Sequence, residues 1–227
     1  MSTKSTPAPS KGAQHTEEKA QQPRYYRGHH WPGLYMLAGI FLAVVVGVFL
    51  WQRHQHQRDA AAQRDIFQAV YAFEAGNFAQ ALRSDGTCAG FLDIIQEYRG
   101  TKTANLAHLY AGICYMRQQD YQEAIQHLQQ FRAKDYLAQA RAWALIGDAY
   151  TEQQNYSQAA VYYLKAADYK PNAFFTPTYL QNASLAYEAL EDYQAALKCY
   201  QRIVKTYPKS DLYEEACKHT SRLEALV

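Results

Sequence analysis

Residues 140–171 read ARAWALIGDAYTEQQNYSQAAVYYLKAADYKP, and this stretch decides the fold. In its first half, apolar and small side chains recur at helical spacing and share one helix face: Trp143, Ile146, Gly147 and Tyr150. The second half repeats this spacing with Ala159, Tyr163 and Ala166. Asn155 is a favoured N-cap, and Pro171 ends the unit because proline has no N–H with which to continue a helix. The stretch predicts two antiparallel helices, with room beside Gly147 for a neighbouring helix.

The same pattern repeats along the chain. A capping residue, an aromatic residue and an alanine three positions later recur at 120–124, 155–159 and 192–196, with a fourth copy at 77–81. The last three copies are 35 and 37 residues apart. A tyrosine stands six residues before each of their aromatics, and a small residue stands three residues before that tyrosine: Gly112 before Tyr115, Gly147 before Tyr150, and Ser184 before Tyr187.

This pattern resembles the tetratricopeptide repeat (TPR), closely over 105–208 and less closely over 62–104. The alternative is a helical bundle in which the aromatic residues recur by chance. The resemblance implies that helix pairs stack into a right-handed α-solenoid, because one repeat cannot bury its apolar face alone.

The segment Leu34–Leu50 carries no charge, and with Trp31 and Trp51 as its ends it spans about 20 residues, enough to cross the hydrocarbon core of a bilayer. A cleaved signal peptide is the alternative, but the run is long and no A-x-A site follows it directly. We therefore expect one retained transmembrane helix. No proline interrupts Arg53–Ala75, so this helix is expected to continue into the first repeat as one helix over 34–75.

These patterns predict an all-α fold, a TPR α-solenoid preceded by one transmembrane helix. We expect residues 1–30 to be a disordered tail, because they are polar and lack apolar periodicity. The other predicted divisions are 31–52, the transmembrane helix; 53–104, a juxtamembrane helix and a degenerate first repeat with a loop at 84–90; 105–208, three repeat units; and 209–227, a capping helix with Asp211 as its N-cap. Phe174 and Phe175, in the linker 172–177, are expected to pack under the array.

Composition excludes several classes of function. Net charge is +2, and basic residues outnumber acidic ones only in the first 52 residues, so the repeat region offers no support for nucleic-acid binding. Of the cysteines, Cys114 and Cys199 are expected to be buried, and a Cys199–Cys217 bridge stays open. No phosphate loop, nucleophile elbow or zinc spacing occurs, and His108, His127 and His219 are expected on the surface. We therefore predict no enzyme activity, no cofactor, no metal site and no small-molecule substrate.

The TPR resemblance implies that the first helix of each repeat lines a concave groove. Ten groove positions are expected to contact a protein partner: Leu106, Leu109, Ile113, Met116, Arg141, Asp148, Thr151, Gln181, Leu185 and Glu188. The register also assigns Arg117, Ala144, Glu152 and Thr178 to this face. The alternative is that some of these residues pack on the protein's own helices.

Some TPR proteins bind C-terminal carboxylates through a clamp of Lys, Arg and Asn. Here Ile113, Asp148 and Leu185 stand where the clamp has asparagine, and an aspartate repels a carboxylate. The groove instead mixes Leu, Ile and Met, which adapt to varied apolar partners. We therefore expect it to bind an apolar helix or an unfolded segment.

The layout of tail, span and repeats, together with the stretch 103–112, is similar to the YfgM-like family of bacterial inner-membrane proteins. That resemblance implies a periplasmic repeat domain associated with the Sec translocon, periplasmic chaperones or exported clients. Arginines flank both sides of the apolar run, so the positive-inside rule does not decide the orientation. The alternative function is a structural scaffold in an envelope machine for cell division, motility or outer-membrane assembly.

Overall fold

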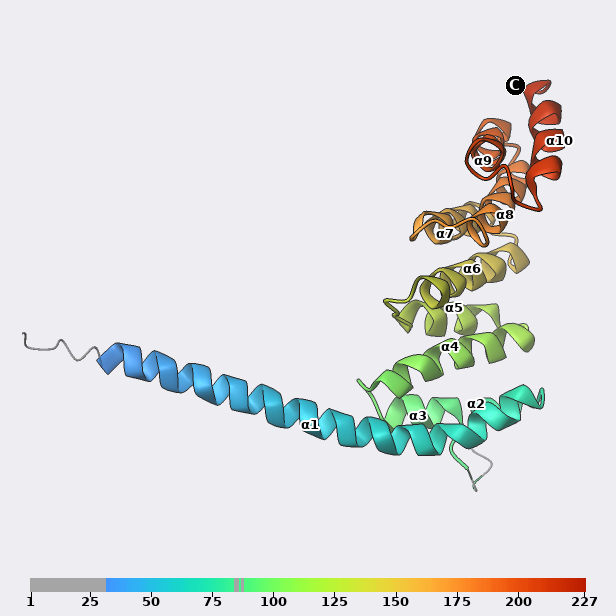
Figure 1. The fold of residues 1–227 in the computed structure, drawn as a ribbon. Helices are drawn as coiled ribbons and strands as arrows, with labels where there is room; N and C mark the ends of the chain where they lie inside the picture. The colour runs from blue at the N-terminus through green and yellow to red at the C-terminus, as the bar shows by residue number, and fades with distance from the viewer. Residues whose placement is uncertain (1–31, 84–85, 87) are drawn as a thin grey trace, which may run out of the picture. The chain divides into compact units, whose positions relative to one another are not determined.

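The computed structural model describes residues 32–83, 86 and 88–227, so the predicted tail over 1–30 lies outside the described residues. The described residues form ten helices and no strand (Figure 1), which confirms the all-α prediction. In chain order the helices are α1 Pro32–Glu74, α2 Phe78–Leu82, α3 Phe91–Glu97, α4 Lys102–Arg117, α5 Tyr121–Gln130, α6 Tyr136–Glu152, α7 Tyr156–Asp168, α8 Thr176–Ala189, α9 Tyr193–Thr206 and α10 Tyr213–Glu224.

The chain divides into two compact units, residues 1–46 and 47–227, and helix α1 belongs to both. In the first unit, the side chains of α1 from Tyr35 to Val46 are exposed and almost all apolar. Among the described helices, α1 is the one that is long and apolar enough to cross a membrane. Its length and composition fit the predicted membrane span. The expected single helix over 34–75 is confirmed by the bounds of α1.

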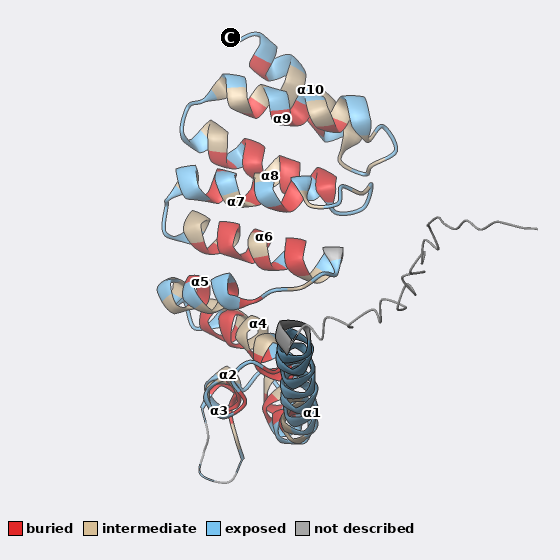
Figure 2. Ribbon diagram, turned by 90° about the vertical axis from the view of Figure 1, so that its left-hand side faces the viewer, coloured by how far each residue is buried: buried red, intermediate tan, exposed pale blue. Residues whose placement is uncertain are grey.

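In the second unit, helices α3 to α10 pack in chain order, each against the next. Figure 2 shows the buried residues on the helix faces that meet their neighbours, with exposed residues on the outside. The buried apolar side chains form four clusters that follow one another along the array. A solenoid of this kind is stabilised mainly by contacts between neighbouring helices.

The first repeat is built from the second part of α1 together with α2 and α3. Side chains of all three helices form one buried cluster: Ala62, Ile66, Ala69 and Ala72 from α1, Leu82 from α2, and Phe91 and Ile94 from α3. Helix α2 ends at Leu82 and α3 begins at Phe91, and residues 84, 85 and 87 of the loop predicted at 84–90 lie outside the described residues. The backbone N–H and the hydroxyl of Thr103 both donate to Asp59 Oδ1, at 2.9 and 2.8 Å, which ties α1 to the start of α4.

The turn within each later repeat has one recurring geometry. The residue before the N-cap has a positive φ in every case: Gln119 (62°), Gln154 (58°) and Glu191 (59°). The next residue caps the second helix through its side chain, since Asp120, Asn155 and Asp192 accept from the N–H three residues on. The first repeat has Gly76 at the left-handed position, where glycine adopts a positive φ without steric cost.

The small residues of the motif allow close helix contact. A Cβ added to Gly147 would lie 2.7 Å from the Tyr163 ring, and one added to Gly112 would lie 2.5 Å from Leu128 Cγ. The predicted room beside Gly147 is thus filled by α7 of the same repeat. Ser184 fits the same place because its hydroxyl donates to the Leu180 carbonyl oxygen at 2.9 Å, inside its own helix.

The C-terminal end of the array corrects one expectation. Helix α10 begins at Tyr213 after Leu212, with no side-chain cap, so Asp211 is not its N-cap. The hydroxyl of Ser210 instead accepts from the N–H of Leu212 at 3.3 Å, inside the preceding turn. Ala216 and Leu223 of α10 are buried against α9, so this helix covers the last apolar face of the array.

The cysteines inside the repeats behave as small apolar residues. Cys114 and Cys199 are buried, as expected, and Cys199 and Cys217 form no disulfide. Burial raises the pKa of the Cys114 thiol to about 12 and also raises the pKa of the Cys199 thiol. Both side chains therefore stay protonated and unreactive at neutral pH.

Candidate partner-binding groove

The ten predicted groove residues lie on α4, α6 and α8, the first helices of the three later repeats. None of them is fully buried. Leu106, Arg141 and Leu185 are exposed, with 40% of Leu106 and 50% of Leu185 accessible. The other seven are half-buried: Leu109, Ile113, Met116, Asp148, Thr151, Gln181 and Glu188. The exposed side chains are the ones that a partner reaches without displacing the protein's own packing.

On α4, most of the predicted residues also serve the protein's own packing. Leu109, Ile113 and Met116 lie against a buried cluster formed by α5 and α6, which includes Ile125, Leu128 and Ile146. This is the arrangement considered as the alternative for these positions. Leu106, one turn earlier, is more exposed than they are.

An open hollow of about 490 Å³ lies between α6 and α8. It is lined by residues of α6 and its N-cap, of α8 and of the linker before α8: Asp135, Leu137, Ala138, Arg141, Phe175, Thr178 and Tyr179. Two groove positions meet here, Arg141 and Thr178. The sequence interpretation did not identify Leu137, Phe175 or Tyr179, although Leu137 lies one turn before Arg141 on the same helix.

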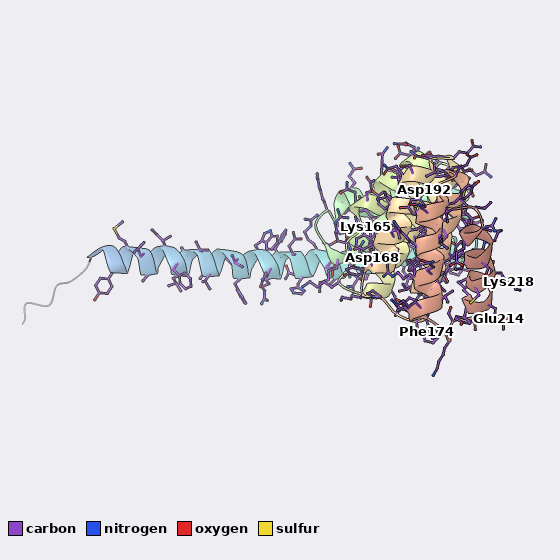
Figure 3. The ribbon with its side chains drawn as sticks, turned by 90° about the horizontal axis from the view of Figure 1, so that it is seen from above. Lys165, Asp168, Phe174, Asp192, Glu214 and Lys218 are labelled. Atoms are coloured by element: carbon purple, nitrogen blue, oxygen red, sulfur yellow. The ribbon has the colours of Figure 1, made fainter. Side chains whose placement is uncertain are left out.

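The expectation that Phe174 and Phe175 pack under the array was wrong. Phe174 is 87% exposed and Phe175 is 43% exposed. Figure 3 shows Phe174 at the edge of the repeat array. The linker is held by Asn172, whose side-chain oxygen accepts from the N–H of Phe174 at 3.0 Å and of Phe175 at 2.9 Å. These hydrogen bonds fix a turn that directs both rings away from the core.

A second hollow, of about 290 Å³, lies further along the same two helices. Its lining comes from α6, α7 and α8: Thr151, Tyr156, Tyr163, Asn182, Leu185 and Ala186. The structure thus brings the predicted residues Thr151 and Leu185 together. Leu185 presents a half-exposed apolar side chain beside a hollow of a size that admits one large side chain.

Between the two hollows, Asp148 is connected to the core. Tyr163 Oη donates to Asp148 Oδ1 at 2.8 Å and lies 3.2 Å from Thr151 Oγ1. Burial raises the pKa of the Asp148 carboxyl group, while the hydrogen bond from Tyr163 and the positive charge of Arg141 oppose this shift. Burial, together with the carboxylate of Asp148, raises the pKa of Tyr163. Tyr163 therefore keeps its proton and holds Asp148 in place.

Glu188, another predicted groove residue, interacts with the capping helix. Its carboxylate accepts a hydrogen bond from Arg222 and lies 3.5 Å from His219 Nδ1. His219 also stacks on Tyr200, with ring centroids 4.6 Å apart. Glu188 thus joins α8 to α10, and a partner would have to compete with this internal ion pair.

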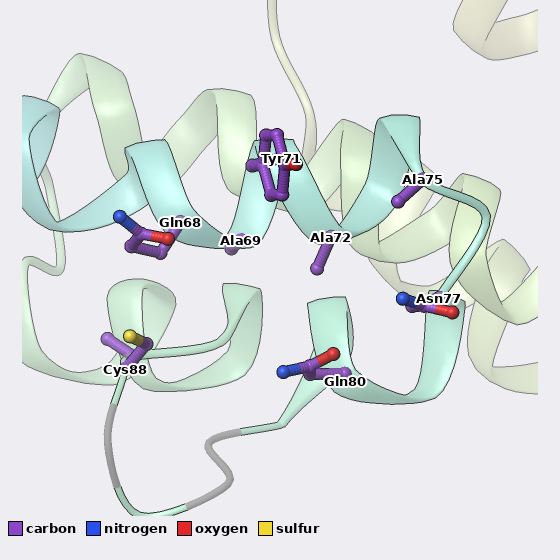
Figure 4. A pocket seen from close by; sticks show the side chains of 9 residues that line it. Gln68, Ala69, Tyr71, Ala72, Ala75, Asn77, Gln80 and Cys88 are labelled. Carbon is purple, nitrogen blue, oxygen red and sulfur yellow. The ribbon is translucent and has the colours of Figure 1, made fainter.

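A further hollow, of about 220 Å³, lies in the first repeat (Figure 4). Helix α1 provides one wall through Gln68, Ala69, Tyr71 and Ala72, and Ala75 follows directly after this helix. The other wall comes from Asn77, Gln80, Cys88 and Ala89. None of the ten predicted groove residues lines it. It therefore lies apart from the groove on α6 and α8.

Two histidines that were expected as separate surface residues meet between α4 and α5. The Nδ1 atoms of His108 and His127 lie 3.1 Å apart, and the His127 ring stacks on Tyr115. Both rings are half-buried. Burial, and secondly the neighbouring His127, lowers the pKa of His108 to about 4. Burial also lowers the pKa of His127, while Glu123 opposes that shift.

Acidification is expected to weaken this contact. The folded-state pKa of His108 is below its ordinary value of 6.5, so its contribution to stability is complete above pH 6.5 and is lost progressively as the pH falls from 6.5 to about 4. Because water screens the partly exposed rings, we expect a loss of about 2 kcal/mol in unfolding free energy. Urea unfolding of the full chain in micelles at about pH 7.5 and about pH 4.5 measures it. An unchanged pH dependence in the double variant His108→Leu/His127→Leu would contradict the assignment.

Comparison with known protein families agrees with this geometry. A tetratricopeptide repeat model matches residues 109–173, and a second tetratricopeptide repeat model matches residues 180–210. No curated protein matches the sequence. The matched segments contain α5, α6, α7 and α9 and most of α4 and α8. The lining of the second hollow lies within them, whereas Phe175, Thr178 and Tyr179 of the larger hollow lie between the two matches. The chain therefore carries tetratricopeptide repeats, which are protein-interaction modules.

Proposed function

We propose that this protein is a membrane-anchored TPR module that assists protein secretion or envelope-protein folding at the bacterial inner membrane. The observation that carries the proposal is the α6–α8 groove, where two hollows lie beside the exposed side chains of Leu137, Phe175 and Leu185. Exposed apolar side chains gathered at a hollow are characteristic of protein-binding surfaces. Its partners would be translocon components, periplasmic chaperones or exported clients.

The membrane anchor and the orientation belong to the same proposal. Helix α1 would cross the membrane with its apolar first part, and residues 53–227 would form a juxtamembrane helix, a degenerate first repeat, three full repeats and a cap. The repeats would then lie in the periplasm. Protease treatment of spheroplasts with an intact inner membrane tests this. Digestion of the repeats supports the proposal, and protection until the membrane is lysed would contradict it.

Capture of partners is expected to depend on the exposed groove residues. Leu185→Glu places a charge beside the second hollow. Leu106→Glu places a charge on the exposed face of α4. Each is expected to reduce captured protein about tenfold or more, because a charge would have to be buried in an apolar contact. Ile113→Glu is less suitable because Ile113 packs against the core. Mass spectrometry after cross-linking of the full-length protein in cells measures the capture.

Val161→Glu is the matched control, because Val161 is 53% exposed on α7 and lines neither hollow of the groove. It is expected to leave capture unchanged. Equal capture by the folded Leu185→Glu variant would contradict the groove assignment. The same experiment separates the two functions: many exported proteins indicate assistance to secretion or folding, whereas one stoichiometric partner indicates a scaffold in an envelope machine.

A further inference from the structure

The larger hollow between α6 and α8 is lined by both apolar and charged side chains. Its walls include Leu137, Ala138 and Phe175, and Tyr179 is buried at 5% exposure. A volume of about 490 Å³ is enough for a large apolar side chain together with the backbone that carries it. The hollow is concave, so it can receive an inserted side chain, whereas the flat surface of a bilayer would not fill it.

Charges are placed asymmetrically along this hollow. Arg141 lines it and forms no ion pair with any other described residue. Asp135, at the other end of the hollow, already caps α6, since its Oδ1 accepts from the N–H of Ala138 at 2.9 Å. The guanidinium of Arg141 is therefore the charged group at this hollow that is available to an anionic side chain.

Acidic groups follow Arg141 along α6. Asp148 comes seven residues later, about 10 Å along a helix at 1.5 Å per residue, and Glu152 comes one turn after it. Burial raises the pKa of Tyr179; the charge of Arg141 opposes this shift and the charge of Asp148 adds to it, so both charged groups act on the same ring. Glu152 is exposed, and its charge raises the pKa of Asp148. The groove thus runs from an apolar hollow to a cation and then to a pair of carboxyl groups.

We propose that this hollow binds a peptide segment of a partner protein with three features in order. A large apolar side chain enters the hollow, an acidic residue next to it pairs with Arg141, and a basic residue lies near Asp148 and Glu152. In an extended peptide at about 3.3 Å per residue, the acidic and basic residues would stand about three positions apart. This inference rests on the proposed protein-binding function and specifies the partner through charge complementarity.

A peptide array tests the order of features. Immobilised twelve-residue peptides, in which the apolar, acidic and basic positions are varied independently and in both chain directions, are probed with the full-length protein in nanodiscs. Replacing the apolar residue by alanine is expected to reduce retention about tenfold or more. Exchanging the acidic residue for lysine is expected to reduce retention as well.

A charge-reversed protein makes the test specific. Arg141→Glu is expected to invert the preference next to the apolar residue, from acidic to basic, a result that loss of folding does not produce. Lys198→Glu, the same charge change at an exposed position of α9, is the control and is expected to keep the original preference. Thr178→Leu fills the hollow and is expected to remove the selection for a large apolar residue.

Three results would overturn the inference. They are a preference that Arg141→Glu does not alter, retention of the protein by none of the peptides, and equal retention of nanodiscs that contain no protein. A photo-crosslinker at Ala138 or at Leu185 in the full-length protein separates this failure from failure of the proposed function. Partners captured at Leu185 but not at Ala138 leave the proposed function intact and refute this inference. Loss of capture at both positions refutes the proposed function.

Discussion

Replacing Tyr163 by alanine is expected to lower the unfolding free energy by about 3–5 kcal/mol, the usual cost of removing a buried aromatic ring. The ring fills the space beside Gly147, and its hydroxyl holds Asp148 at 2.8 Å. The substitution therefore creates a cavity and leaves a partly buried carboxyl group without its donor. Urea unfolding of the full chain, followed by circular dichroism, measures the change.

Two further variants assign this loss to its causes. Tyr163→Phe keeps the ring but removes the bond to Asp148, so a smaller loss of about 1–3 kcal/mol is expected. Gly147→Ala alone is expected to cost about 1–2 kcal/mol, since the new methyl group meets the ring and its higher helix propensity offsets only part of that clash. In the Tyr163→Ala background the same methyl group is expected to cost nothing. Equal costs in the two backgrounds would show that the close contact is not responsible.

Replacing Leu223 by alanine is expected to cost about 2–5 kcal/mol, because Leu223 is fully buried between α10 and the last repeat. In a solenoid each helix depends mainly on its neighbours, so the effect should be local. Amide hydrogen exchange is expected to rise in α8, α9 and α10 and to stay unchanged in α4 and α5.

Leu226→Ala provides the control for this prediction. Leu226 is 58% exposed just after α10, and its replacement is expected to change stability by less than about 0.5 kcal/mol. A uniform rise of exchange throughout the array in the Leu223→Ala variant would mean that the repeats unfold as one cooperative block. The location of the effect thus decides between nearest-neighbour and global cooperativity.

The helix pairs were predictable from the sequence because their causes are local. Helical spacing, the N-cap residues Asp120, Asn155 and Asp192, and the small residues Gly112 and Gly147 each act over a few positions along the chain. The repetition of these signals at 35 and 37 residues then indicated stacking. For the same reason the family register placed all ten groove residues on the first helices of repeats, with none fully buried.

The hollow between α6 and α8 was decided by tertiary structure alone. The linker that Asn172 fixes brings Phe175 to the hollow, next to Leu137 of α6 and Tyr179 of α8. In the sequence, helix α7 separates α6 from α8. The pair His108 and His127 depends in the same way on how α4 lies against α5. No spacing rule predicts these meetings, because they depend on the angle and distance between packed helices.

The amino-acid sequence by itself determined that this chain forms paired helices, where each pair turns, and which faces are apolar. Only the tertiary structure decided which apolar side chains remain uncovered and which charged groups stand beside them, as with Arg141 next to the hollow and Glu188 paired with Arg222. The physical reason is range: helix propensity, capping and periodicity act within a few turns, whereas the surface that a partner meets is formed by residues that packing brings together from different repeats.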